Sequence, residues 1–204
     1  MKILGLSCSP RKSGNTAILV AEALDGARSE GGEVELYSLA GKEIKPCDGC
    51  NSCHKTGKCH INDDMQAIYP KLLEADGIIF GTPVYFHAMT AQAKALIDRT
   101  FVLRHPSIGL ASKVGGVIAV AGRLGIIDTL KSLYFYFAYN HMIPADSVIA
   151  YAREKGTVKD DEMTMKSAWE LGREMAQIVD QKFKFPGEFD RGLMAYVMNK
   201  YGLL

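Results

Sequence analysis

Short apolar runs alternate with stretches of helical periodicity along most of this 204-residue chain. The apolar runs are typical of buried strands and cover residues 2–6, 33–39, 77–81, 114–121 and 147–151. Apolar residues recur at helical spacing in residues 15–29, 63–75, 90–103, 125–139 and 160–182. Alternation of this kind produces a parallel sheet with helices on both faces. We therefore predict an α/β fold with a doubly wound, five-stranded parallel sheet of order 2-1-3-4-5.

The length and composition are those of one globular domain with a sizeable core. We predict a domain over residues 1–182, in which a cysteine-rich loop at 45–62 follows the second strand. Residues 183–204 would form a helical tail, because one helical face carries Phe189, Leu193, Tyr196 and Val197. This tail either contacts a partner subunit or folds back onto its own domain. The aromatic run at 133–139 leaves the same choice between core and interface.

The formal net charge is only +1 and no long run carries one sign, so the sequence lacks the basic face that nucleic-acid binding normally requires. The longest charge-free stretch covers residues 132–145, whereas a membrane span needs about 20 apolar residues. The first apolar run is too short for the core of a signal peptide. We therefore expect a soluble, cytoplasmic protein that binds neither nucleic acid nor a membrane.

The first predicted strand leads into the loop Ser7–Thr16, which ends at a helix N-terminus. Hydroxyl groups, a glycine and an asparagine stand where free backbone N–H groups can bind a phosphate, and Arg11 adds a charge-assisted contact. The loop has neither the G-x-G-x-x-G of a dinucleotide site nor the Gly-Lys-Ser/Thr of a P-loop. The alternative is a plain turn that Ser13 or Asn15 caps.

This loop, SPRKSGNT after KILGL, resembles the phosphate loop of the NADPH-dependent FMN reductase family, a branch of the flavodoxin-like fold. The resemblance continues in ADGIIFGTPVYF at 75–86, and in Lys94 with Asp98 and Arg99. It implies a flavodoxin-like fold and FMN, which is preferred over FAD because no adenine-binding region is apparent. It further implies that the FMN phosphate is held by Ser9, Arg11, Ser13, Asn15 and Thr16, and that the isoalloxazine is flanked by Pro83, Val84, Tyr85 and Phe86.

In this fold, ligands bind beyond the carboxyl ends of the central strands. Two more loops leave that edge of the predicted sheet. The loop at 82–87 supplies aromatic side chains and a rigid proline, which suit a flavin wall, although core packing is the common role of aromatics. After the fourth strand comes AGRLG, where we expect Arg123 near the pyrimidine edge of the flavin, or else in solvent. The candidate cofactor-binding residues are Ser7, Ser9, Arg11, Ser13, Gly14, Asn15, Thr16, Thr82, Pro83, Val84, Tyr85, Phe86, Ala121, Gly122 and Arg123.

Four of the five cysteines, Cys47, Cys50, Cys53 and Cys59, have the spacing C-x2-C-x2-C-x5-C. Such crowding indicates metal binding or redox chemistry rather than structural disulfides. Three closely spaced thiolates and a fourth slightly further on suit a compact iron–sulfur cluster. A four-cysteine zinc site and a C-x-x-C dithiol without metal are the alternatives. Cys8 lies outside this spacing and is expected to be a packed residue, and His60 is a remote substitute ligand.

The cysteine spacing resembles that of the iron–sulfur flavoproteins, a subgroup of the same family. The resemblance implies one [4Fe–4S] cluster and one FMN per subunit, electron transfer between them, and a homodimer or homotetramer. Lysines surround the cysteine loop at Lys45, Lys55 and Lys58, and they would steer an acidic electron carrier such as ferredoxin if they are more than ordinary solvated side chains.

The sequence thus predicts an FMN-dependent oxidoreductase that passes electrons between a [4Fe–4S] cluster and FMN. Its partners would be a ferredoxin-like carrier or NAD(P)H, together with a small-molecule electron acceptor. No catalytic side chain is expected, because the cofactors perform the chemistry. The alternatives are an NAD(P)H-dependent FMN or quinone reductase without a cluster, a non-catalytic flavodoxin-like electron carrier, and a zinc-stabilised binding module.

Overall fold

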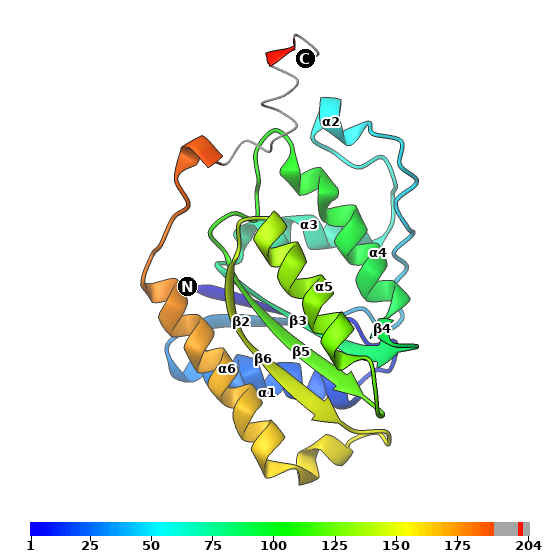
Figure 1. Ribbon diagram of the computed structural model, residues 1–204, viewed down its shortest axis with the longest axis vertical. Coiled ribbons are helices and arrows are strands. Elements are labelled where there is room, and N and C mark those ends of the chain that lie inside the picture. The colour runs from blue at the N-terminus through cyan, green and yellow to red at the C-terminus, as the bar shows by residue number, and fades with distance from the viewer. Residues whose placement is uncertain (190–199, 202–204) are drawn as a thin grey trace.

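Five parallel strands form the centre of the computed structural model, which describes residues 1–189, 200 and 201 (Figure 1). They are β1 (Lys2–Ser7), β2 (Glu33–Ser38), β3 (Gly77–Tyr85), β5 (Val114–Ala121) and β6 (Ile143–Tyr151). Their order in the sheet is β2-β1-β3-β5-β6. Counted along the chain as parallel strands, this order is the predicted 2-1-3-4-5, which is confirmed. The last strand begins four residues before the predicted position 147.

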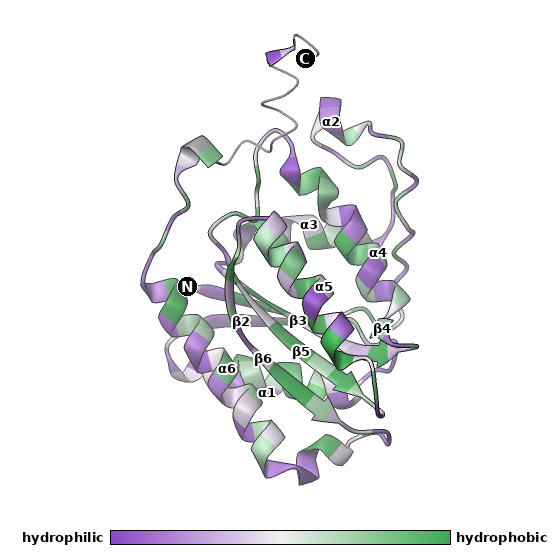
Figure 2. Ribbon diagram, viewed as in Figure 1, coloured by the Kyte–Doolittle hydropathy of each residue, from purple (hydrophilic) through white to green (hydrophobic). Residues whose placement is uncertain are grey.

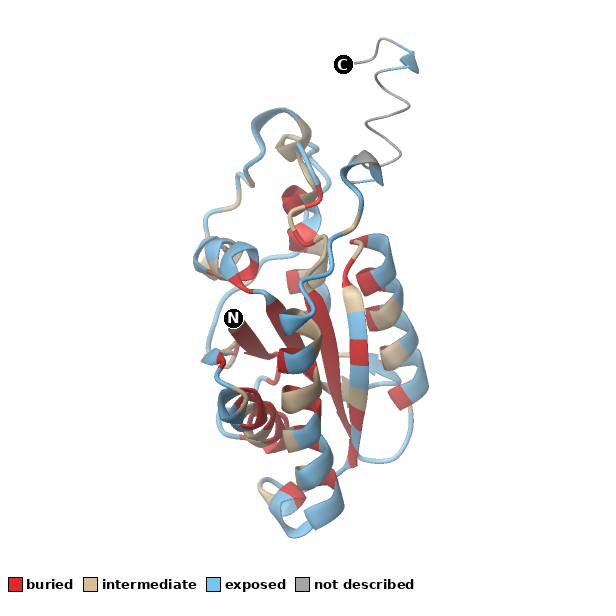
Figure 3. Cartoon of the chain, turned by 90° about the vertical axis from the view of Figure 1, so that its left-hand side faces the viewer, coloured by how far each residue is buried: buried red, intermediate tan, exposed pale blue. Residues whose placement is uncertain are grey.

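The helices cover both faces of the sheet, as the sequence predicts. One face is covered by α1 (Asn15–Ser29) and α6 (Glu162–Asp180), and the other by α3 (Ile68–Glu74), α4 (Ala91–Arg99) and α5 (Ile126–Tyr139). Hydrophobic residues concentrate on the strands (Figure 2), and the central strands and the inner helix faces are buried (Figure 3). All eight residues of β5 are buried because this strand is paired on both sides and covered on both faces.

Several short elements interrupt the predicted segments. A single helical turn, α2 (Cys53–Thr56), lies within the cysteine loop, and 3-10 turns precede α3 at η1 (Asp64–Ala67) and follow α4 at η2 (Thr100–Arg104). Two more are η3 (Thr157–Asp160) and η4 (Gly187–Phe189). Helical periodicity does not distinguish a 3-10 turn from an α-helix at its end, so the predicted helices at 63–75 and 90–103 are longer than α3 and α4.

The segment from Thr82 to Met89 is a hairpin, and the prediction of an irregular loop there was wrong. Strand β3 continues to Tyr85 and pairs with the antiparallel β4 (Ala88–Met89). The two turn residues, Phe86 and His87, have φ angles of 48° and 68°. Tight hairpin turns of this geometry normally contain Asn-Gly or Gly-Gly, so the sequence carries no signal for one at Phe-His.

Two features of the predicted interface segments are visible in the structure. Within the aromatic run, Tyr136 and Phe137 are buried, which confirms core packing for them, whereas Phe135 and Tyr139 are exposed and stack on each other. In the tail, Phe185 stacks on His141, and the predicted helical face at 193, 196 and 197 lies outside the described residues. No helix in the described part of the chain is both long and apolar enough to span a membrane.

Helices α1 and α6 approach each other closely enough to bring backbone against backbone. A Cβ atom at Gly26 would lie 1.9 Å from the carbonyl oxygen of Trp169, and one at Gly172 would lie 1.7 Å from that of Ala23. Real Cβ atoms do not approach an oxygen this closely, so both positions require glycine. Because α1 starts at the end of the loop Ser7–Thr16, this contact with α6 fixes the position of the helix that follows that loop.

We predict that Gly172→Ala lowers the free energy of unfolding by about 1–3 kcal/mol, the usual cost of overpacking. In an open helix this substitution would instead stabilise by up to about 1 kcal/mol, because alanine is the better helix former. Ser167→Ala, on the exposed face of α6, is the matched control and should change stability by less than about 0.5 kcal/mol. Urea denaturation measures both, and an unchanged or raised stability for Gly172→Ala would contradict the packing.

Candidate functional site

A pocket of about 280 Å³ lies at the carboxyl edge of the sheet, where the doubly wound topology predicts a ligand site. It is lined by the loops after β1, β5 and β6 and by the end of β3, where the hairpin begins. The lining residues are Ser9, Arg11, Gly14, Asn15, Thr16, Pro83, Val84, Tyr85, Val120, Gly122, Ala152, Arg153 and Lys155. The sequence singles out the first loop, the end of β3 and the loop after β5, but it does not single out the loop after β6.

The loop after β1 presents the N-terminus of α1 to this pocket. The helix begins at Asn15, and its N-cap residue is Gly14, which has no side chain to bond the free N–H groups of the first turn. The Ser9 hydroxyl accepts a hydrogen bond from the backbone N–H of Arg11 at 3.1 Å and fixes the bend of the loop. Free N–H groups beside Arg11 are the arrangement that binds a phosphate.

Buried hydroxyl groups connect this loop to the hairpin. The Thr90 hydroxyl donates to the carbonyl oxygen of Cys8 at 2.9 Å, and the Thr90 N–H donates to the hydroxyl of Thr82 at 3.2 Å. Thr90 also caps α4. Thr82 is therefore a supporting residue beneath the pocket and not part of its lining.

The hairpin forms the apolar wall of the pocket, where Pro83, Val84 and Tyr85 face it. Phe86, at the tip, is fully exposed and does not line it. The wall is held against the start of α5, because a Cβ atom at Gly125 would lie 2.5 Å from the Cα of His87. Gly125 has a φ of +91°, which also favours glycine.

The predicted cofactor-binding residues thus fall into two groups, and their contact with FMN stays a prediction. Those that line the pocket are Ser9, Arg11, Gly14, Asn15, Thr16, Pro83, Val84, Tyr85 and Gly122. Those that do not are Ser7, Ser13, Thr82, Phe86, Ala121 and Arg123. Ser7 and Ala121 are buried at strand ends, and Ser13 and Arg123 are exposed beside the pocket loops.

Sequence reasoning missed the loop after β6, which adds Ala152, Arg153 and Lys155 to the pocket. The Arg153 Nε donates to the carbonyl oxygen of Gly122 at 3.2 Å, so this loop lies directly on the loop after β5. Its two cations directly after a predicted strand were the available signal, because every parallel strand ends at the same edge of the sheet.

The second candidate site is the cysteine loop. Cys47 and Cys50 are exposed, Cys53 and Cys59 are half-buried, and none forms a disulfide. Burial raises the pKa of Cys53, and the neighbouring Cys50, Cys47 and Cys59 raise it further. Cys8 is fully buried outside the loop, as predicted, and burial raises its pKa to about 12.

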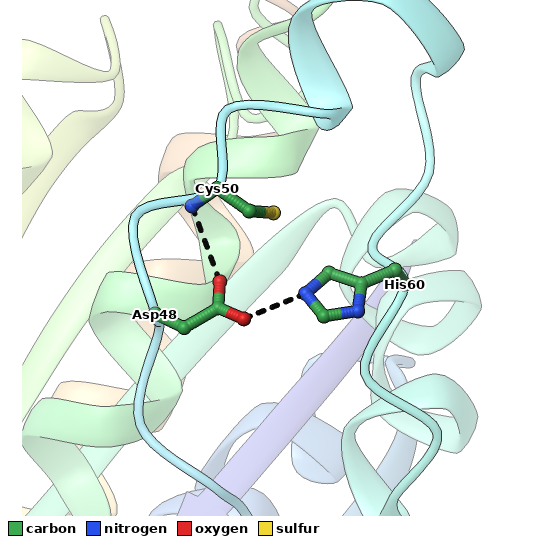
Figure 4. A group of neighbouring side chains, drawn as sticks. All are labelled: Asp48, Cys50 and His60. Atoms are coloured by element: carbon green, nitrogen blue, oxygen red, sulfur yellow. Dashed lines mark hydrogen bonds and ion pairs between the residues drawn. The ribbon is translucent and has the colours of Figure 1, made fainter.

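Within the loop, Asp48 joins two arms that are distant in sequence. Its carboxylate accepts a hydrogen bond from the backbone N–H of Cys50 at 3.2 Å and lies 2.8 Å from the Nε2 of His60 (Figure 4). Among the described residues, only Asp48, Cys50 and His60 place three ligand atoms within 4.8 Å of one another. Four thiolates on one zinc ion would be about 3.8 Å apart, given Zn–S bonds of about 2.3 Å. The four cysteines are not gathered in that way.

The neck of the cysteine loop is closed by a buried ion pair between Arg99 and Asp63. The two side chains are 0% and 1% exposed, and Arg99 Nη1 lies 2.7 Å from Asp63 Oδ2. Arg99 also donates to the carbonyl oxygens of Lys45 and Ile61, at 2.9 and 3.2 Å, and the N–H of Lys45 donates to Asp63. Both ends of the loop are therefore bonded to the last residue of α4.

Burial opposes the charges of this pair, but the hydrogen bonds between its members outweigh that effect. They raise the pKa of Arg99 and, with two backbone N–H groups, lower the pKa of Asp63. The pair is therefore ionised at neutral pH and links the loop firmly to the core.

Helix α4 separates the two candidate sites. Its first turn follows the hairpin that walls the pocket, whereas its last residue holds the cysteine loop (Figure 1). Beyond that residue, Cys47 and Gly49 line a second cavity of about 430 Å³ together with Phe101, Arg104 and Tyr139. The cysteine loop thus lies along α4, and α2 lies near the C-terminal end of that helix (Figure 1).

We predict that Arg99→Met lowers the free energy of unfolding by about 3–5 kcal/mol, because it leaves Asp63 as an unpaired buried charge. The matched control is Lys94→Met on the same helix, where Lys94 pairs with Asp98 in solvent and contributes at most about 1 kcal/mol. Urea denaturation measures the stability, and the rate of tryptic cleavage at Lys55 and Lys58 reports on the loop. Equal effects of the two substitutions would contradict the role of Arg99.

The sequence model of a family described as NADPH-dependent FMN reductase matches residues 1–156 of this chain. An iron–sulfur flavoprotein of Methanocaldococcus jannaschii is 44% identical over 191 residues, which cover 88% of this chain and 97% of that protein. An iron–sulfur flavoprotein of Archaeoglobus fulgidus is 30% identical over 200 residues, 97% of this chain and 90% of that protein.

Among solved structures, RosB with a bound riboflavin-phosphate intermediate superposes with a TM-score of 0.76 over all of this chain and 88% of its own. A flavodoxin from the domain Archaea superposes with a TM-score of 0.61 over 88% of this chain and 99% of its own. Their sequence identities are 16% and 19%, so these similarities establish the flavodoxin-like fold alone.

Proposed function

This protein belongs to the NADPH-dependent FMN reductase family, and on that premise we propose that it passes electrons between FMN and a [4Fe–4S] cluster held by the cysteine loop. Its activity is that of an FMN-dependent oxidoreductase. When bound, FMN supplies one- and two-electron chemistry and the cluster supplies one-electron transfer. The observation that supports the cluster is the set of four free cysteines on one loop whose two ends are bonded to Arg99.

The pocket at the carboxyl edge fits FMN in its chemistry. The uncapped first turn of α1, with Ser9 and Arg11, would bind the phosphate. The hairpin residues Pro83, Val84 and Tyr85 would exclude water from one side of the ring. Neither task requires a side chain that exchanges protons, which agrees with a reaction carried by the cofactor.

The cysteine loop fits a cluster better than a single metal ion. The loop supplies four thiolates, from Cys47, Cys50, Cys53 and Cys59. In a cubane cluster each thiolate would bind a different iron atom, so the four thiolates need not converge on one point. Asp48 and His60 would hold the two arms of the loop at a fixed separation. Arg99 and Asp63 would hold the loop ends while the cluster is bound.

The proposal extends to partners and place of action. Lys45, Lys55 and Lys58 are exposed around the cysteines and would attract an acidic, ferredoxin-like carrier, while NAD(P)H or a small-molecule acceptor would exchange electrons at the flavin. A homodimer or homotetramer is the proposed assembly. The cytoplasm is the proposed compartment, because its reducing conditions keep thiols available for a cluster.

The test is an iron and acid-labile sulfide assay with a visible spectrum, on protein purified without oxygen. We expect about four irons and four sulfides per FMN, the composition of a [4Fe–4S] cluster. Cys53→Ser should abolish iron binding and leave FMN bound. Cys8→Ala is the matched control, because Cys8 is buried outside the loop, and it should leave the iron content unchanged.

Two other results would contradict the proposal and identify its alternatives. Stoichiometric FMN without iron, together with direct oxidation of NAD(P)H, would identify a pyridine-nucleotide-dependent flavin or quinone reductase. One zinc per chain without iron would identify a structural metal site on the same cysteines.

A further inference from the structure

The charges around the flavin pocket come largely from the loop after β6. The lining of the pocket contains three cations, Arg11, Arg153 and Lys155, and no carboxylate. Two of the three belong to that loop, although the net charge of the whole chain is only +1. We propose that Arg153 and Lys155 make this pocket selective for a flavin that carries a phosphate, and that Asn15 is the positioning residue that holds them there. This inference rests on the FMN site of the proposed function and is independent of the cluster.

Both polar atoms of the Asn15 side chain bond this loop. Its Nδ2 donates to the carbonyl oxygen of Glu154 at 2.7 Å, and its Oδ1 accepts from the backbone N–H of Gly156 at 2.7 Å. Gly156 has a φ of +90°, a left-handed conformation that turns its N–H toward the asparagine. The resemblance assigns Asn15 to the phosphate, and its backbone N–H and the second N–H of its Nδ2 are left for that role.

Three further bonds hold Arg153 between the phosphate loop and the loop after β5. Arg153 Nε donates to the carbonyl oxygen of Gly122 at 3.2 Å, and Arg11 Nη1 donates to that of Arg153 at 3.5 Å. The N–H of Ala152 donates to Ala121 at 3.0 Å. Within the described residues, the two Nη groups of Arg153 have no hydrogen-bond partner and no carboxylate pairs with Lys155.

A pocket with this charge should discriminate between flavins by their phosphate. Three cations and the free N–H groups of α1 favour a dianion, whereas an uncharged riboflavin gains nothing from them. The shared chemistry is a phosphate group, and it can come from FMN or from a nicotinamide nucleotide. We assign it to FMN, because Arg153 lines the same pocket as Gly14 and Thr16 of the phosphate loop and bonds Arg11 of that loop through its carbonyl oxygen.

The test measures the dissociation constants of FMN and riboflavin by flavin fluorescence, on the full chain freed of flavin. Arg153→Gln should weaken FMN binding by about tenfold or more, the effect of losing a charge-assisted contact, and change riboflavin binding by less than about twofold. The salt dependence of FMN binding should fall as well. The matched control is Lys159→Gln in the same connection, an exposed lysine outside the pocket, which should change neither constant.

A second variant tests the role of Asn15. Asn15→Ala should weaken FMN binding as Arg153→Gln does, and the double variant should lose little more, because Asn15 acts through the loop that carries Arg153. Preserved riboflavin binding shows that the pocket is still folded in each variant. Additive losses would overturn the positioning role.

Three outcomes would overturn the phosphate assignment. They are unchanged FMN binding in Arg153→Gln, an equal loss of FMN and riboflavin, and a raised KM for NADPH at saturating FMN with unchanged FMN affinity. Failure of the unsubstituted chain to bind FMN would instead defeat the flavin part of the proposed function. Absence of iron from that chain would defeat the cluster and leave this inference standing.

Discussion

A parallel sheet has to be covered on both faces, and this requirement places the functional loops of the molecule. Strand β5 is buried along its entire length. Because neighbouring strands are parallel, each connection must return to the other edge of the sheet through a helix before the next strand begins. The carboxyl end of β3 and the loops after β1, β5 and β6 therefore meet at one pocket. The close contact of α1 with α6 at Gly26 and Gly172 fixes the helix whose first turn forms the floor of that pocket.

The cysteine loop obeys a different constraint, because none of residues 45–62 is buried and the hydrophobic core therefore does little to hold the loop in place. A fully buried ion pair does so instead. Such pairs cost much desolvation free energy, and replacing both members by apolar residues often stabilises a protein. Arg99 and Asp63 are better explained by what they fix, which is the position of Lys45 and Ile61 relative to α4. Specificity of position, not net stability, is the physical gain.

The sequence predicts those parts of the molecule that depend on local pattern. Apolar periodicity identifies all five parallel strands, their alternation with helices predicts the strand order, and the motifs of the first loop and the cysteine loop indicate two candidate sites. It does not predict the hairpin at Phe86 and His87, because these residues adopt a turn that usually requires glycine or asparagine. It also cannot show that Asn15 bonds Glu154 or that Arg99 bonds Asp63, because these contacts join residues 139 and 36 positions apart. Hydrogen bonds between residues that are far apart in the sequence produce no periodic pattern from which they could be predicted.

The separation of the two sites by α4 has a consequence for how such a chain can evolve. The pocket is built on β1, β3, β5 and β6, whereas the cysteine loop is an excursion between β2 and α3 that is joined to the rest at its neck. Shortening that excursion, or losing its cysteines one by one, would leave every residue of the pocket in place. The fold therefore permits one lineage to gain or lose the cysteine loop while the pocket stays intact.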